Sequence, residues 1–256
     1  SYSRYIIGEV HWARGDPARA IETMEGAIHH GRQAGFVVVL AWTQAQLAVV
    51  YGLLGRPDLG RELAVSALAQ AEKYMPNFRS LTSGAVARLH LLTGDVDAAA
   101  ATLHQGLVGV APFLQDFFAP FGAGVQSRLA FARGDFESAV QFAAHFLAVT
   151  GQLGVRRYTP EANHLYAQTL MASGRPEAAM EALRVGRSEA QAMGARWWLW
   201  QILADLSRAE AERGNAAEAA ALRGQAREIV EDIADHCPAE LRESFLGLPD
   251  VKSLTG

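Results

Sequence analysis

A glycine returns along this chain at an almost constant spacing, and this period constrains the fold more than any other feature. Successive glycines of the series are 40, 39, 40, 40 and 40 residues apart: Gly15, Gly55, Gly94, Gly134, Gly174 and Gly214. Such self-similarity in a sequence without low-complexity stretches indicates a tandem repeat. Repeat proteins stack similar units into one scaffold, so their function depends on what the surface of that scaffold binds.

The residues around each glycine predict a tight turn between two helices. Glycine adopts the left-handed conformation that ends a helix, and the Asp, Asn or Pro residues that follow favour the start of the next one. The flanking segments, such as residues 6–14 and 18–34, carry apolar residues at three- and four-residue steps, as amphipathic helices do. A second set of Gly and Pro breaks follows about half a period later, and no run alternates cleanly enough to predict a strand. The predicted unit is a helical hairpin.

Small residues recur at two fixed places around these glycines. Seven residues before them stand Gly8, Ala48, Ala87, Ser127, Ala167 and Ser207, and five residues after them stand Ala20, Gly60, Ala99, Ala139, Ala179 and Ala219. A small side chain at one point of each helix lets two helix backbones approach closely. We therefore expect close contact between the two helices of every hairpin.

This pattern resembles the tetratricopeptide repeat (TPR) family over nearly the whole chain. That family places a small residue on the first helix, a glycine in the turn and an alanine on the second helix, as Gly8, Gly15 and Ala20 are placed here. The period departs from the usual value of about 34 residues, and the family's aromatic signature is sparse: Tyr51 fits it and Ala130 does not. The longer repeats resemble the long-period type of bacterial signalling ATPases and maltose-activator-like regulators.

The resemblance implies an all-α fold, a right-handed α-solenoid of six TPR-like helical hairpins plus a C-terminal capping helix. The expected hairpins are residues 1–35, 36–75, 76–114, 115–154, 155–194 and 195–238. Residues 239–256 are expected to form the capping helix and a tail over the last hairpin, and residues 112–120 an irregular linker. Because the period is unbroken, we expect one elongated solenoid. The chain opens on Ser1 with an apolar first helix, so we expect it to be the C-terminal part of a longer protein.

Composition and motifs give little sign of catalysis. The net charge of −4 offers no reason to expect nucleic acid binding, and the single cysteine, Cys237, excludes an internal disulfide and favours a reducing, cytoplasmic location. No phosphate-binding loop, HExxH motif, zinc-spaced cysteine pair or signal peptide is visible. The apolar residues 36–55 fit a buried repeat helix better than a membrane span. We expect a non-catalytic protein without a cofactor or metal ion.

The candidate binding residues come from the family's concave groove, which is lined by the first helix of each hairpin. The face opposite the small residues supplies the chosen set: Tyr5, Glu9, Trp42, Arg88, Phe121, Arg128, His164, Gln168 and Arg208. Three of its arginines share one register and could form a ladder that holds carboxylates or phosphates. The alternative is that they are solvated or paired with neighbouring acids.

Aromatic residues leave a similar choice open. Trp197, Trp198 and Trp200 crowd the start of one helix, where they can pack between hairpins or anchor a peptide or sugar in the groove. Two functions follow. The first is a protein–protein interaction scaffold, the regulatory arm of a bacterial signalling or transcription regulator, which binds a protein, a peptide or another domain of its own chain. The second, implied by the maltose-activator resemblance, is a small-molecule inducer-sensing domain. Neither binds nucleic acid or a membrane.

Overall fold

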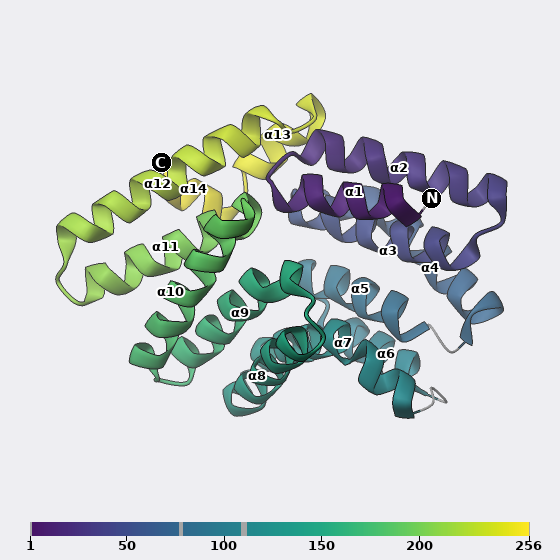
Figure 1. The fold of residues 1–256 in the computed structure, drawn as a ribbon, viewed down its shortest axis with the longest axis horizontal. Helices are drawn as coiled ribbons and strands as arrows, with labels where there is room; N and C mark the ends of the chain where they lie inside the picture. The colour runs from purple at the N-terminus through teal and green to yellow at the C-terminus, as the bar shows by residue number, and fades with distance from the viewer. Residues whose placement is uncertain (1, 77–78, 109–111, 256) are drawn as a thin grey trace.

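The computed structural model describes residues 2–76, 79–108 and 112–255, with side chains described outside residues 112–121. The described part holds fourteen α-helices and no strand. The first twelve form six successive hairpins (Figure 1): α1 (Tyr2–Ala13) with α2 (Pro17–Ala34), α3 (Val37–Leu53) with α4 (Pro57–Tyr74), α5 (Arg79–Leu92) with α6 (Val96–Leu107), α7 (Pro112–Ala132) with α8 (Phe136–Gln152), α9 (Thr159–Ala172) with α10 (Pro176–Met193), and α11 (Arg196–Glu212) with α12 (Ala216–Asp235). The predicted all-α solenoid of repeats is confirmed.

The turns form as the sequence predicts. All six repeat glycines adopt the left-handed conformation, with φ between 76° and 83°. Asp16, Asp95 and Asp135 each accept a hydrogen bond from the backbone N–H three residues later, which caps the second helix of the hairpin. Every repeat turn therefore carries a glycine stop signal, and three of the six also carry an Asp that caps the next helix.

The small residues of each hairpin face one another across the helix pair. Ser127 Oγ donates to the carbonyl oxygen of Ala139 at 2.8 Å, and Ser207 does the same to Ala219 at 2.7 Å. A Cβ added to Gly60 would lie only 2.6 Å from the backbone oxygen of Ala48. Larger side chains would force the two helices apart.

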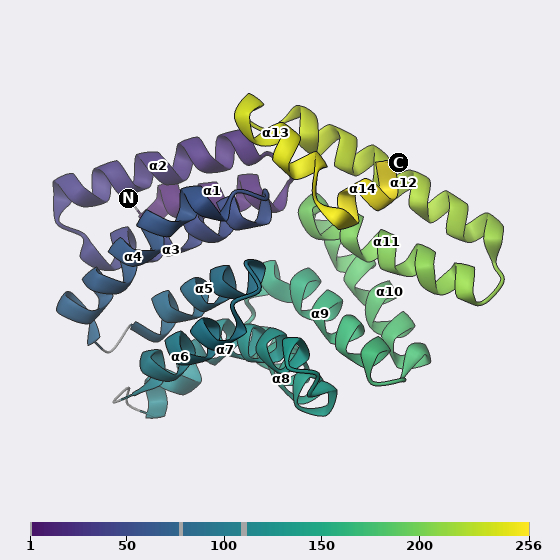
Figure 2. The same cartoon turned by 180° about the vertical axis from the view of Figure 1, so that it is seen from behind.

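The solenoid is curled, and its two ends touch, so the expectation of an elongated shape is wrong (Figures 1 and 2). The indole rings of Trp12 on α1 and Trp197 on α11 have centroids 3.9 Å apart. Phe245 of α13 (Ala239–Leu246) packs on Trp197 at 5.8 Å, and Ser244 Oγ donates to the Leu54 carbonyl oxygen at 2.8 Å. The closing helix therefore joins the last hairpin to the second.

Two local expectations also need correction. The segment beyond α13 forms a further helix, α14 (Pro249–Thr255), whose Val251 and Leu254 are buried. The expected irregular linker over residues 112–120 lies within α7, which begins at Pro112. Among the described helices, none is long and apolar enough to cross a bilayer.

Candidate functional site

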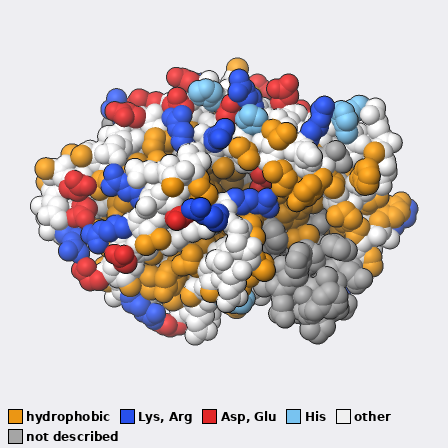
Figure 3. Space-filling model, in the orientation of Figure 1, with side chains coloured by type: hydrophobic (Ala, Val, Ile, Leu, Met, Phe, Trp, Pro, Cys, Tyr) orange, Lys and Arg blue, Asp and Glu red, His pale blue; other side chains and the backbone are white. Residues whose placement is uncertain are grey.

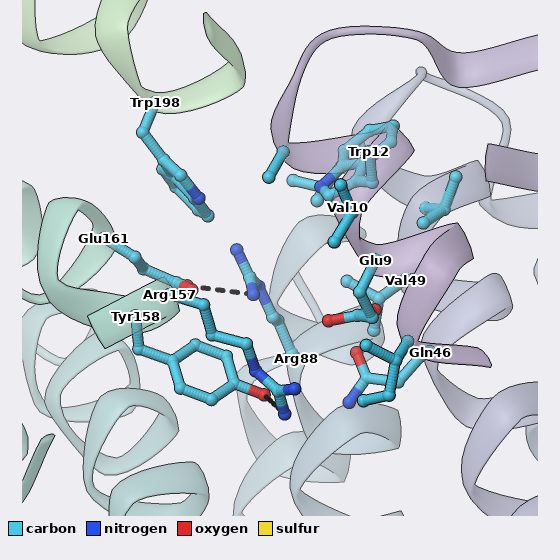
Figure 4. Close-up of a pocket in the computed structure, with 14 residues that line it drawn as sticks. Glu9, Val10, Trp12, Gln46, Val49, Arg88, Arg157, Tyr158, Glu161 and Trp198 are labelled. Atoms are coloured by element: carbon cyan, nitrogen blue, oxygen red, sulfur yellow. Dashed lines mark hydrogen bonds and ion pairs between the residues drawn. The ribbon is translucent and has the colours of Figure 1, made fainter. Parts of the chain in front are cut away.

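Curling encloses a pocket near the centre of the molecule, which we call the inner pocket. It has a volume of about 110 Å³ and is lined from α1, α3, α5, α9, α11 and η2 (Arg156–Tyr158), the turn before α9. Figure 3 shows one face of the molecule hollowed near its middle, with acidic and basic side chains around the hollow. The residues that matter for its chemistry are labelled in Figure 4: Glu9, Trp12, Gln46, Arg88, Arg157, Tyr158, Glu161 and Trp198.

Two predicted arginines meet on one carboxylate at this pocket. Arg88 Nη1 and Arg128 Nη2 lie 2.9 Å and 2.8 Å from the same oxygen, Glu161 Oε1. The Glu161 side chain is only 8% exposed, so these contacts are shielded from water. Burial, reinforced by the nearby Arg88, lowers the pKa of Arg128 to about 10, although Glu161 opposes the shift. Arg88 and Arg128 are thus paired with a neighbouring acid, which was the alternative to a free arginine ladder.

Helix α1 brings a second carboxylate to the opposite wall. Burial raises the pKa of Glu9 to about 7, with Glu161 adding to the shift and Arg157 and Arg88 opposing it. Tyr5 lies one turn earlier and is buried, with its ring edge-on to Trp42 at 6.2 Å. Burial, and then the Glu9 charge, hold the pKa of Tyr5 well above its usual value. Glu9 is thus the pocket group that can gain or lose a proton near neutral pH.

The predicted set contained Glu9 and Arg88 of this pocket but not its other labelled residues. Arg157 and Tyr158 come from η2, where the Arg157 Nη2 donates to the Tyr158 hydroxyl at 2.8 Å. Their position in a linker put them outside a register built on the first helix of each hairpin. For Trp198 the sequence left open packing between hairpins or a role in the groove, and its ring lies 5.7 Å from the Arg88 guanidinium carbon.

The predicted arginine ladder does not continue to Arg208. His164 Nε2 lies 2.9 Å from Asp205 Oδ2, and Arg208 forms an ion pair with the other oxygen of Asp205. Burial would raise the pKa of Asp205, but these two partners outweigh it and hold that pKa below its usual range. Gln168 is exposed beside this group. The candidate residues therefore divide into two clusters, and Phe121 lies outside the residues whose side chains are described.

The second cluster borders an open groove on the concave side, which we call the C-terminal groove. It has a volume of about 370 Å³ and is lined from α7, α9, α10 and α11 by Phe131, Ala167, Gln168, Met171, Ala172, Leu183, Asp205, Arg208 and Glu212. The lining has an apolar floor with charged residues along one side. Such a surface can hold an apolar side chain flanked by polar groups.

Metal and thiol chemistry find no support at these places. In the described ranges, no three His, Cys, Asp or Glu side chains gather as a metal site. Cys237 is buried, and burial raises the pKa of its thiol to about 12, although Arg242 opposes the shift. A thiol held in its protonated form is a poor nucleophile.

The tryptophans of α11 serve mainly to join hairpins. Trp197 packs on Trp12 and Phe245, and Trp200 is buried with its ring 6.5 Å from Trp197. These contacts hold the wall of the inner pocket in place.

Comparison with known families agrees with the architecture. The tetratricopeptide repeat model matches residues 3–25, 41–66 and 85–105, which fall in the first three hairpins. Comparison with curated proteins found no matching relative. The matched segments show tetratricopeptide repeats in the first three hairpins, and the later hairpins share their helix, left-handed glycine and helix arrangement.

Proposed function

We propose that this chain is the regulatory arm of a bacterial signalling or transcription-regulatory protein, and that it acts by binding another protein. Tetratricopeptide repeats are generally protein-interaction scaffolds without catalytic activity. The observation that carries the proposal is the C-terminal groove, which remains open on the concave side after the ends of the solenoid have met. We also propose that the chain itself catalyses no reaction.

The groove suits a peptide segment with an apolar residue between polar ones. Phe131 is 40% exposed at one edge, and Met171 forms part of the floor. Arg208 and Glu212 lie one turn apart on α11 and offer both signs of charge to such a segment. Its apolar centre would supply affinity and its polar edge would fix orientation.

Site-specific photocrosslinking in the host cell tests this interaction. A photoreactive amino acid replaces Phe131 in the groove or, as the control, Val185, which is 43% exposed on α10. We expect a protein adduct from position 131 that is lost when Arg208→Glu is added. The same adduct from both positions, or one that is indifferent to Arg208→Glu, would overturn the groove assignment.

The inner pocket favours a second function, the sensing of a small-molecule inducer. The pocket lies between the first hairpin and the third and fifth, so a bound molecule would touch parts of the solenoid that meet only when it curls. A ligand that binds only this arrangement stabilises it by mass action. We expect an inducer to raise the melting temperature of the wild-type protein and not that of Arg88→Met. Equal increases in both proteins would argue against sensing at this pocket.

A further inference from the structure

We propose that the inner pocket binds a small organic acid through its carboxylate, an inference that rests on the second proposed function and specifies its ligand. Three arginines and two glutamates meet at the pocket and beside it. Arg88 and Arg157 line the pocket with Glu9 and Glu161. Arg128 lines the neighbouring cavity and contacts Glu161 together with Arg88.

Arg157 is the arginine of these three that does not form an ion pair with Glu161. Its guanidinium donates to the neutral phenol of Tyr158 and has no carboxylate oxygen within 4.0 Å among the described residues. Its Nε is buried and without a hydrogen-bond partner in the same part of the chain. A buried N–H of a charged group that lacks an acceptor is costly. Arg157 also lines the inner pocket, where a carboxylate can accept from its terminal N–H groups.

Glu9, on the facing wall of the pocket, does not repel such an anion when its carboxyl group is protonated. Figure 4 shows the Glu9 carboxyl group across the pocket from Arg88, with Gln46 beside it. Glu9 in its protonated form turns from a competing anion into a hydrogen-bond donor. The pocket then faces its ligand with donors from Arg88, Arg157 and Glu9.

Size and apolar walls narrow the ligand class. Trp12, Trp198 and Val49 also line the pocket, and this apolar surface suits a short hydrocarbon part. A cavity of about 110 Å³ is smaller than one that holds benzene, roughly 150 Å³. These limits favour an acid with a short chain over a peptide. The Glu161 carboxylate disfavours a dianion such as hydrogen phosphate.

Binding would also act on the curled shape. Glu9 and Trp12 belong to the first hairpin, whereas Arg157 and Trp198 lie at the start of the fifth and sixth. A carboxylate held between these groups would strengthen the contact between the two ends. The site thereby links a small acid to the conformation of the whole solenoid.

Proton–nitrogen NMR of the five tryptophan indoles provides the test, with Trp198→Phe to assign its resonance. Propionate and its neutral isostere propionamide are titrated at constant ionic strength. We expect propionate to shift the Trp198 resonance and propionamide to leave it in place. Arg157→Gln should weaken binding at least tenfold, while Arg156→Gln, its exposed neighbour paired with Glu189, should bind as the wild type does.

Further measurements test the role of Glu9 and the size of the ligand. Glu9→Gln should bind propionate more tightly than the wild type at pH 8, because the wild-type carboxyl is then ionised. Tetra-alanine with a free carboxyl terminus should be too large, so Arg157-dependent binding of this peptide would overturn the small-acid assignment. Equal binding by Arg157→Gln and Arg156→Gln would also overturn it.

A panel of neutral metabolites is titrated in the same way. If one of them shifts the Trp198 resonance and propionate does not, the pocket does not select a carboxylate, but the proposed sensing function stands. No shift from any solute would overturn both.

Discussion

The clearest test of the buried network is Glu161→Gln, which keeps the shape of the side chain and removes its charge. Arg88 and Arg128, whose side chains are 17% and 23% exposed, would then face a neutral amide. Each lost pair is worth about 4 kcal/mol at 4 Å with an effective dielectric constant near 20. The removed desolvation cost of the carboxylate offsets part of this, and breaking a buried pair typically costs about 3 to 5 kcal/mol.

We expect a loss of about 3 kcal/mol in the free energy of unfolding, since both arginines keep some solvent contact. For a chain of this size, the corresponding fall in melting temperature is about 6 to 12 °C. Urea unfolding followed by circular dichroism, together with calorimetry, measures both quantities. The matched control is Glu137→Gln, which breaks an ion pair with Arg175 in which the side chains are 67% and 43% exposed. This control should change stability by less than about 1 kcal/mol.

A double-mutant cycle separates charge from packing. Adding Arg88→Met to Glu161→Gln removes one of the two uncompensated cations, so it should restore part of the lost stability. A Glu161→Gln protein within 1 kcal/mol of Glu137→Gln would refute the reasoning that this network is shielded from water.

Other substitutions test the pocket, the hairpin and the closure. Glu9→Gln should be more stable than the wild type by about 3 kcal/mol at pH 8 and equal to it at pH 4. The folded-state pKa of Glu9, near 7, exceeds the unfolded value, so the stability of the wild type falls as pH rises between the two. Urea unfolding at both pH values measures this difference. Gly60→Val should cost at least about 2 kcal/mol by overpacking, with Gly224→Val, which has open space, as the exposed control by thermal melting. Trp12→Ala should loosen the closure and raise the radius of gyration in small-angle X-ray scattering, whereas an unchanged radius would mean that α13 alone holds the ends. Cys237 should react with Ellman's reagent only at the rate of unfolding, and immediate labelling would contradict its burial.

The hairpins could be predicted from sequence because their signals are local. A left-handed glycine, an Asp cap and two facing small residues act within about 13 residues of one another, so Gly15 and Gly134 specify their turns independently of the rest of the fold. The shared register of Arg88 and Arg128 could be read from sequence for the same reason, since it follows from the geometry of one helix. The sequence alone therefore determined the repeat, the helices and the faces they present.

Tertiary structure decided the curl, and with it the inner pocket. Whether Trp12 reaches Trp197 depends on small rotations summed over six hairpins, which no local signal records. The same summation brings Arg88 and Arg128 to Glu161 while it leaves Arg208 with Asp205. Partners 33 to 73 residues apart, such as Arg128 and Arg88 with Glu161, are chosen by the curvature of the whole solenoid. The chemistry of the pocket is therefore a property of the stack, because no single repeat contains it.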